Sequence, residues 1–222
     1  MTAIYAINHF NFIDRIVKKK RQEMLDIINK KLRDIKIHDA LDIGTTNDQD
    51  YQSSNFLIKN LKNISEFKSV SDQYIDDNFF SKILTKSITD NFTNEEIDNF
   101  KSDLVISNAT IEHVGNFENQ IKMVKNVAKL ARKFFVITTP NRYHPLDFHT
   151  KLPFIHWLPK NIHRSLLNFI GLNYFAKEEN LNLFSEQDLN VCMKESGIKN
   201  YKIFYINLLG FKSNFLIFGK IV

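Results

Sequence analysis

The stretch "ALDIGTTND" at 40–48 places one acid and one glycine at the end of an apolar run. Loops that bind the pyrophosphate of a dinucleotide carry further glycines, which let backbone amides approach the phosphates. Here Thr46 and Asp48 occupy those places, and Asp48 would put a negative charge beside the phosphate. A nicotinamide or flavin dinucleotide is therefore disfavoured on electrostatic grounds, and a dinucleotide oxidoreductase with it.

A second group of residues with chemical potential lies in "SNATIEHV", after the apolar run at 104–106. The stretch supplies an amide in Asn108, a carboxylate in Glu112 and an imidazole in His113. The unperturbed pKa of histidine lies near 6.5, which suits a general base. His113 and the later His149 are the candidates for that role. In the competing interpretation, Glu112 and His113 are first-turn residues of a helix, where the helix dipole favours an acid.

The spacing of apolar residues predicts the elements that must position these groups. We expect helices over 9–35, 51–63, 116–131 and 185–197, strands over 38–44, 66–72, 82–92, 103–108 and 133–141, and a hairpin of strands 201–209 and 215–222 joined by "GFKSN". Strands that alternate with helices form a parallel sheet covered on both faces. The sequence thus predicts an α/β protein with a Rossmann-like, doubly wound, mostly parallel seven-stranded sheet and a terminal antiparallel hairpin.

Ligands of such sheets bind at the carboxyl ends of the strands. Asp42, Asp72, Asp90 and Asn108 are all expected there. A ligand that has no phosphate but carries a cationic centre and a free ammonium group would suit an acidic turn. S-adenosylmethionine has both, together with ribose hydroxyls that need carboxylate acceptors. The pattern therefore favours S-adenosylmethionine as the cofactor.

From residue 40 to residue 222 the chain resembles the class I S-adenosylmethionine-dependent methyltransferases of the small-molecule type. The resemblance rests on "LDIG", on "VSD" at 70–72, on "SITDNF" at 87–92 and, most specifically, on "DLVISNATIEHV" at 103–114. It implies methyl transfer to an oxygen or nitrogen of a small molecule or of a glycan or lipid-linked intermediate. The chain departs from the family in lacking the later glycines and in the wide interval between its first two acids.

The resemblance also implies roles for single residues. Asp42 and Gly44 would contact the methionine head of the cofactor. Asp72 would bind the ribose, and Asp90 with Asn91 would bind the adenine. The implied cofactor-binding set is Asp42, Gly44, Thr45, Thr46, Asp72, Asp90, Asn91, Asn108, Ala109 and Glu112. Each acid also has a structural alternative, as a strand-end cap or an ordinary turn residue.

The segment 144–184 has its own composition. The four prolines of the chain fall within 140–159, the single Trp is Trp157, and no acid occurs between Phe148 and Lys177. Long loops in compact domains usually carry function. We expect a lid over the acceptor, in which aromatic side chains form the pocket and Lys151 or Arg164 holds an anionic group. The predicted substrate-binding residues are Arg142, His144, Lys151 and Trp157.

Two alternatives remain for this segment. It contacts a membrane surface through 148–177, or it is a structural cap or homodimer contact whose histidines are satisfied in packing. In the first case the residues that face lipid would be Trp157, Ile162, Leu166, Phe169 and Ile170. No metal is expected, because His144, Asp147 and His149 fit no strong ligand spacing.

Length and composition limit the remaining possibilities. A chain of 222 residues suits one domain, divided into a helical segment (1–37), a cofactor-binding half (38–143), the lid (144–184) and a C-terminal helix with hairpin (185–222). The single Cys192 excludes a disulfide framework. The net charge of +5 comes without a basic, aromatic-rich face, so no nucleic-acid partner is expected. Without a signal peptide or a long apolar run, a cytoplasmic location is expected. The second candidate function is a binding protein of the same fold without turnover.

Overall fold

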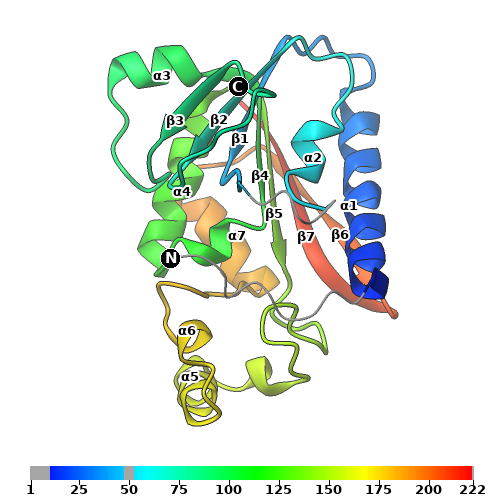
Figure 1. Ribbon diagram of the computed structural model, residues 1–222, viewed down its shortest axis with the longest axis vertical. Coiled ribbons are helices and arrows are strands. Elements are labelled where there is room, and N and C mark those ends of the chain that lie inside the picture. Colours follow the sequence, from blue (N-terminus) through cyan, green and yellow to red (C-terminus); the bar gives the residue numbers. More distant parts are fainter. Residues whose placement is uncertain (1–10, 48–52, 222) are drawn as a thin grey trace.

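The computed structural model describes residues 11–47 and 53–221, which form a single seven-stranded sheet with helices on both faces (Figure 1). The strands follow the order β3-β2-β1-β4-β5-β7-β6. They are β1 (Asp39–Ile43), β2 (Glu66–Ser71), β3 (Lys82–Thr85), β4 (Ser102–Asn108), β5 (Ala131–Pro140), β6 (Tyr201–Leu208) and β7 (Phe211–Lys220). The first five strands of the chain pair in parallel, whereas β7 is antiparallel to both β5 and β6. The predicted fold class is confirmed.

Alternation along the central strands builds two cores, one on each face of the sheet. The helices are α1 (Asn11–Leu32), α2 (Phe56–Lys59), α3 (Asn94–Phe100), α4 (Phe117–Leu130), α5 (Lys160–Phe169), α6 (Asn173–Ala176) and α7 (Glu186–Glu195), with short 3₁₀ turns η1 (Ile111–His113) and η2 (Ile155–Trp157). On β4, Leu104 and Ile106 face the core that α1 and α2 cover, and Val105 faces the core under α4 and α7. Central strands buried on both faces explain why these segments read as continuous apolar runs.

Three elements differ from the sequence-based expectation. The strand β3 ends at Thr85, where its register with Ser71 stops, so Asp90 lies in a loop and not at the strand end. The helix expected over 51–63 is the four-residue α2, and residues 51–52 lie outside the described chain. In the hairpin the turn is Leu209–Gly210, with φ of 52° and 82°. Two positive φ angles are what a tight hairpin needs to match strand twist, so β7 already begins at Phe211.

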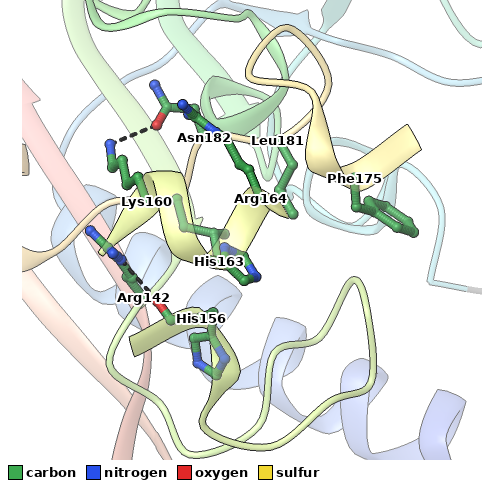
Figure 2. Close-up of a pocket in the computed structure, with 9 residues that line it drawn as sticks. Arg142, His156, Lys160, His163, Arg164, Phe175, Leu181 and Asn182 are labelled. Carbon is green, nitrogen blue, oxygen red and sulfur yellow. Dashed lines mark hydrogen bonds between the residues drawn. The ribbon is translucent and has the colours of Figure 1, made fainter. Parts of the chain in front are cut away.

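The segment 144–184 crosses the carboxyl edge of the parallel strands, where α5 and α6 lie in Figure 1. It leaves and rejoins the sheet side by side, because Asn141 bridges to Phe184 and the amide of Arg142 donates to the carbonyl of Phe184 (2.8 Å). Within it, α5 and its neighbours enclose a small cavity (Figure 2). None of the described helices is long and apolar enough to cross a membrane.

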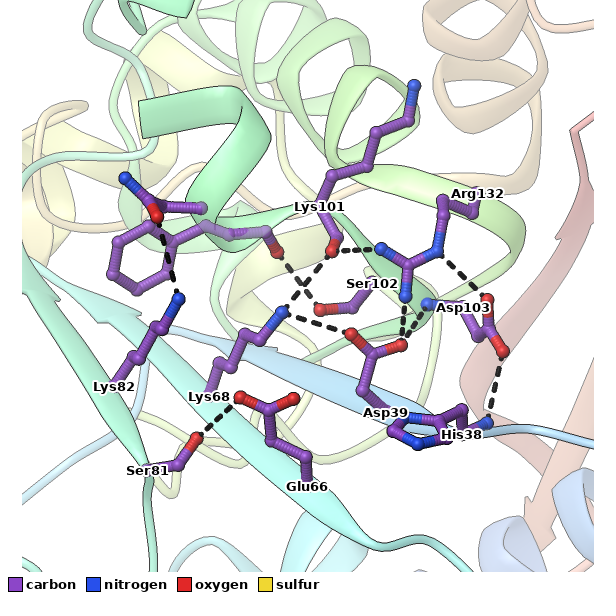
Figure 3. Close-up of polar contacts among 12 residues, drawn as sticks. His38, Asp39, Glu66, Lys68, Ser81, Lys82, Lys101, Ser102, Asp103 and Arg132 are labelled. Carbon is purple, nitrogen blue, oxygen red and sulfur yellow. Dashed lines mark hydrogen bonds and ion pairs between the residues drawn. The ribbon is translucent and has the colours of Figure 1, made fainter. Parts of the chain in front are cut away.

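The opposite, amino-terminal edge of the sheet is held by a cluster of ion pairs (Figure 3). Asp39 on β1 is 3% exposed and pairs with Lys68 Nζ on β2 (3.0 Å) and with Arg132 on β5. Asp103 on β4 pairs with Arg132 Nε (3.0 Å) and Lys133 Nζ (2.8 Å). Burial alone would raise the pKa of Asp103, but hydrogen bonds from Lys133, the His38 amide and Arg132 lower it to about 2. The cluster ties four neighbouring strands together.

Candidate functional site

The loop after β1 is fixed by hydroxyl groups where other nucleotide loops use glycines. Thr45 Oγ1 donates to Asp42 Oδ2 (2.7 Å) and accepts from Ser69 Oγ (2.8 Å). Ser71 Oγ donates to the carbonyl of Thr45 (2.7 Å), and the amide of Thr46 donates to Asn55 Oδ1 (3.0 Å). The predicted ligand Thr45 thus has its hydroxyl engaged inside the protein and positions Asp42. Asp48 lies outside the described residues.

Asp42 itself is buried at the end of β1. Burial raises its pKa to about 6, although the Thr45 hydroxyl and the charge of Lys59 act in the opposite direction. A buried carboxylate is costly unless a cation or several donors stabilise it. The end of β1 therefore offers a negative charge that an ammonium group of a ligand would stabilise.

Gly44 is required by a close contact between two loops. Its φ is +83°, and a Cβ at this position would lie 2.3 Å from Thr110 Oγ1 and 2.6 Å from Thr110 Cγ2. Thr110 Oγ1 also donates to the carbonyl of Ile43 (3.2 Å). The adjoining Ala109 has a φ of +54°, in the left-handed region that non-glycine residues rarely adopt. The chain therefore turns sharply at the end of β4 and packs directly on the β1 loop.

The predicted cofactor ligands lie on neighbouring strands. Asp72 follows β2 directly and is exposed, and Asn108 ends β4, where its Oδ1 accepts from Thr138 Oγ1 (2.7 Å). With Asp42 on β1 between them, three adjacent strands carry a polar side chain at the carboxyl edge. Asp90 and Asn91 are exposed in the loop before α3, and Asn126 of α4 anchors that loop through the carbonyl of Asp90 (2.9 Å).

Next to this edge, Glu112 and His113 of η1 meet His149 of the 144–184 segment. Glu112 is fully buried, and its Oε2 accepts from Thr139 Oγ1 (3.0 Å). Its Oε1 has no hydrogen-bond partner among the described residues and lies 3.9 Å from His149 Nε2. The rings of His113 and His149 are 4.9 Å apart between centroids. The structure thus brings both predicted catalytic histidines together, with a carboxylate beside them.

The far side of each imidazole is also held. His113 Nδ1 lies 2.7 Å from the carbonyl of Asn180, so Nδ1 carries the proton and donates. His149 Nδ1 lies 3.3 Å from Asp147 Oδ1. The other carboxylate oxygen of Asp147, Oδ2, accepts a hydrogen bond from Thr150 Oγ1 (2.7 Å). Burial lowers the pKa of His113, while for Asp147 hydrogen bonds with His149 and Thr150 outweigh burial and lower the pKa. In the neutral form of each ring, the proton is on Nδ1, which faces its oxygen partner, and Nε2 is unprotonated.

Among the residues predicted to bind the acceptor or its anionic group, Arg142 and Arg164 line the cavity of Figure 2, whereas His144, Lys151 and Trp157 do not. The cavity measures about 20 Å³, room for about one water molecule, and Lys160, His163 and Arg164 also line it. Arg142 Nε donates to the carbonyl of His156 (3.0 Å), and Lys160 Nζ donates to Asn182 Oδ1 (2.7 Å). Three cationic side chains thus converge on one small space inside the segment.

His144, Lys151 and Trp157 instead fold the segment itself. The carbonyl of His144 accepts a hydrogen bond from Trp157 Nε1 (3.2 Å). The imidazole ring of His144 stacks on the ring of Phe148, with centroids 4.8 Å apart. Lys151 Nζ donates to the carbonyl of Phe148 (2.7 Å). These contacts hold the segment together, but the buried Nε2 of His144 has no hydrogen-bond partner among the described residues. The sequence reasoning missed Thr110, Thr139 and Asn180, because a hydroxyl or a backbone carbonyl carries no motif of its own.

The arrangement of helices and strands described above is shared with proteins of known structure. Neither a protein-family model nor a curated protein sequence matches the chain. Magnesium protoporphyrin IX methyltransferase from Synechocystis PCC 6803, solved with bound SAH, is similar in structure with a TM-score of 0.58 at 12% identity, over 99% of this chain and 91% of that one. The 1,6-didemethyltoxoflavin-N1-methyltransferase of Burkholderia thailandensis, solved with its substrate and S-adenosylhomocysteine, gives 0.56 at 9% identity, over 91% and 78%.

The N-methyltransferase NodS from Bradyrhizobium japonicum WM9, solved with S-adenosylhomocysteine, gives a TM-score of 0.51 at 9% identity, over 90% of this chain and 86% of that one. The three solved structures share the arrangement of the whole chain at very low identity. The chain therefore has the fold of the class I S-adenosylmethionine-dependent methyltransferases, as the sequence resemblance predicted.

Proposed function

We propose that the protein binds S-adenosylmethionine at the carboxyl edge of its sheet and transfers the methyl group to an acceptor. The acceptor nucleophile is an oxygen or nitrogen of a small molecule or of a glycan or lipid-linked intermediate. One observation carries the proposal: the polar ends of three adjacent strands meet the cluster of Glu112, His113 and His149 at that edge. The solved methyltransferases of the same fold that contain SAH support it.

The residues present fit this cofactor. The buried carboxylate of Asp42, whose pKa burial raises to about 6 despite the charge of Lys59, would stabilise the ammonium group of the methionine head. The exposed carboxylate of Asp72, one strand away, would accept hydrogen bonds from the ribose hydroxyls. Asp90 and Asn91 would bind the adenine from the anchored loop before α3. The acidic loop disfavours a dinucleotide for the same electrostatic reason that it favours a cationic ligand.

When bound, the cofactor supplies a methyl group already activated on a sulfonium. The protein's part is to align the acceptor, which is worth about 7–11 kcal/mol in ideal cases, and to remove its proton. His149 is placed for this second task, because Asp147 holds its Nδ1 and leaves Nε2 free to accept a proton. The carboxylate of Glu112, 3.9 Å from Nε2, would stabilise the resulting imidazolium. A general base of this kind contributes about 10²–10⁴-fold.

The acceptor is proposed to carry an anionic group. Arg142, Lys160 and Arg164 line the cavity inside the 144–184 segment, and among the described residues only Arg164 of these three has a carboxylate partner, Glu178 Oε1 at 2.9 Å. His163 Nε2 is buried at the same cavity without a partner among the described residues. A phosphate or carboxylate at the mouth of this cavity would offset the excess of positive charge.

Calorimetric titration with S-adenosylhomocysteine, with NADH as the control ligand, tests the cofactor. We expect micromolar binding of the first and none of the second. The Asp72→Ala variant should weaken S-adenosylhomocysteine binding at least tenfold, because the ribose loses its acceptor. Asp76→Ala is the matched control, since Asp76 is an exposed acid four residues further along the same loop. Equal affinity of the two variants would contradict the role of Asp72.

The second candidate is a binding protein of the same fold without turnover. The observation that favours it is the first loop, in which hydroxyl side chains replace the usual glycines. Transfer of a labelled methyl group from S-adenosylmethionine to a set of O- and N-nucleophiles, each anionic member paired with its neutral analogue, separates the two. Binding of S-adenosylhomocysteine together with transfer to none of the set would favour the binding protein.

A further inference from the structure

We propose that Glu112, His113 and His149 form a binding site for a divalent transition-metal ion. One ligand atom of each side chain lies within 4.8 Å of the others, and they come from two parts of the chain. Imidazole is a borderline donor and carboxylate a hard one, and a set of two imidazoles with one carboxylate suits ions from Mn²⁺ to Zn²⁺ better than Mg²⁺ or Ca²⁺. With metal–ligand bonds of about 2.0–2.2 Å, two donors of one ion are at most roughly 4.0–4.4 Å apart, so any pair of these atoms beyond that separation must move closer when the ion binds.

The strongest sign of a missing cation is Glu112 Oε1. This oxygen is buried and has no hydrogen-bond partner among the described residues. A buried carboxylate oxygen without a partner is costly, so such atoms are normally hydrogen-bonded or bound to metal. Its neighbour His149 Nε2, at 3.9 Å, is too far for a hydrogen bond but at the right separation for two donors of one ion.

The other polar atom of each ligand is held by a partner that fixes its orientation. Thr139 Oγ1 donates to Glu112 Oε2, the carbonyl of Asn180 accepts from His113 Nδ1, and Asp147 Oδ1 contacts His149 Nδ1. Metal-binding histidines show this arrangement, in which the second ring nitrogen is bonded to a carbonyl or carboxylate. Three side chains are thus oriented by neighbouring groups, and each keeps one atom that can bind an ion: Glu112 Oε1, His113 Nε2 or His149 Nε2.

The ion would also connect the two parts of the site. Glu112 and His113 lie just after β4, beside the proposed cofactor edge, and His149 belongs to the 144–184 segment, whose helices α5 and α6 lie beyond that edge in Figure 1. Three protein ligands leave coordination positions open for the acceptor. If methyl transfer proceeds as proposed above, an ion there would lower the pKa of a bound acceptor hydroxyl so that its proton passes to water, and His149 would then bind the ion in place of acting as the base.

The test is a titration of the untagged full chain with Mn²⁺ in the absence of any other ligand, followed by the electron paramagnetic resonance of free Mn²⁺. We expect one equivalent to bind, and Glu112→Gln and His149→Gln each to weaken binding at least tenfold. His38→Ala is the matched control, because His38 is an exposed histidine at the opposite edge of the sheet. Circular dichroism checks that each variant is folded, and His149, less buried than Glu112, provides the variant with the smaller folding risk.

No binding by the parent chain, or binding that both ligand variants retain, would overturn the metal site. Competition by Zn²⁺ for the Mn²⁺ site would support it. A separate calorimetric titration with S-adenosylhomocysteine keeps the two proposals distinguishable. Mn²⁺ binding without S-adenosylhomocysteine binding would overturn the proposed function and leave the metal site standing, and the reverse result would overturn the metal site alone.

Discussion

Two buried carboxyl groups at the site have opposite surroundings. Asp147 has hydrogen bonds from Thr150 and His149 that lower its pKa, so it stays ionised. Asp42 has one hydroxyl donor and the more distant charge of Lys59, and burial raises its pKa to about 6. Of these two carboxyl groups, Asp42 is therefore the one that changes its charge close to neutral pH in the folded protein.

The raised pKa of Asp42 predicts a pH dependence of cofactor binding. In the folded chain this carboxyl takes up a proton as the pH falls through about 6, whereas its unperturbed value is 3.8. Below pH 6 the charge that would stabilise the ammonium group is lost. Affinity for S-adenosylhomocysteine should then fall about tenfold per pH unit.

Calorimetry between pH 5 and pH 8 measures this dependence, and Asp42→Asn should flatten the profile at the weaker level. The effect of the Asp42 charge on folding stability has the opposite sign to its effect on cofactor binding. A raised carboxyl pKa costs stability above pH 6, and the cost disappears as the pH falls towards 3.8. Asp42→Asn should therefore gain stability relative to the parent at pH 8 and not at pH 4. A parent profile that is already flat would contradict the assignment of Asp42.

At the scale of elements, the ion pairs at the amino-terminal edge of the sheet predict that replacing Asp39 lowers the free energy of unfolding substantially. Asp39→Ala removes the partner of Lys68, whose side chain is only 7% exposed. Breaking a buried ion pair on one side costs about 3–5 kcal/mol, because the remaining charge stays unpaired. Urea denaturation should show this loss of unfolding free energy.

The matched control for Asp39→Ala is Glu66→Ala at the same edge of the sheet. Glu66 accepts one exposed hydrogen bond from Ser81 Oγ (2.9 Å), visible in Figure 3. Its replacement should change the unfolding free energy by no more than about 0.5 kcal/mol. Similar losses for the two variants would show that the Asp39 cluster contributes no more than an ordinary surface contact.

The elements best predicted from sequence are those with a strong apolar period. The helix expected over 116–131 is α4, and the strand around Leu104 is β4. The ends of strands and the positions of turns, which local hydrogen bonds and backbone angles set, could not be predicted from the sequence. The strand β3 stops because pairing with β2 ends at Ser71, and the hairpin turns at Leu209, where a leucine adopts a positive φ. Neither feature leaves a mark in the order of apolar and polar residues.

For the candidate site, too, the sequence predicted the residues that follow a local pattern and missed those that depend on how distant segments fold together. Acids at strand ends and the two histidines follow from motif and period, and Asp42, Asp72, His113 and His149 all lie at the carboxyl edge. The meeting of His149 with Glu112 depends on how 144–184 folds back across that edge, which no local pattern specifies. For the same reason His144, Lys151 and Trp157 were expected at the acceptor and instead hold the segment together.

At the scale of the whole molecule, an apolar stripe on the 144–184 segment predicts contact with lipid. Along and just beyond α5, Ile162, Phe169 and Ile170 are 51%, 88% and 45% exposed, at the spacing of one helix face. The stretch 148–177 has four basic residues and no acid, and two of the four, Arg164 and Lys177, pair with Glu178 and Glu179 just beyond it. We expect weak binding to vesicles that contain anionic lipid, because apolar area and charge both contribute.

Vesicle flotation measures this binding. The Phe169→Asp variant should lose it. Leu209→Asp is the control, because Leu209 is 85% exposed in the β6–β7 turn, outside this segment. Flotation that is absent in the parent, or unchanged by Phe169→Asp, would leave the face without a role at membranes.

The contact between Gly44 and Thr110 has a consequence for how this chain could have diverged. A side chain at position 44 would overlap the one at position 110, so neither position is free to drift alone. Over evolutionary time a larger residue at 44 should occur only where 110 has become small and the φ angle at 44 has left the left-handed region. Distant relatives of this chain would then be recognised by a correlated pair of positions, 66 residues apart, where a glycine-rich signature would overlook them.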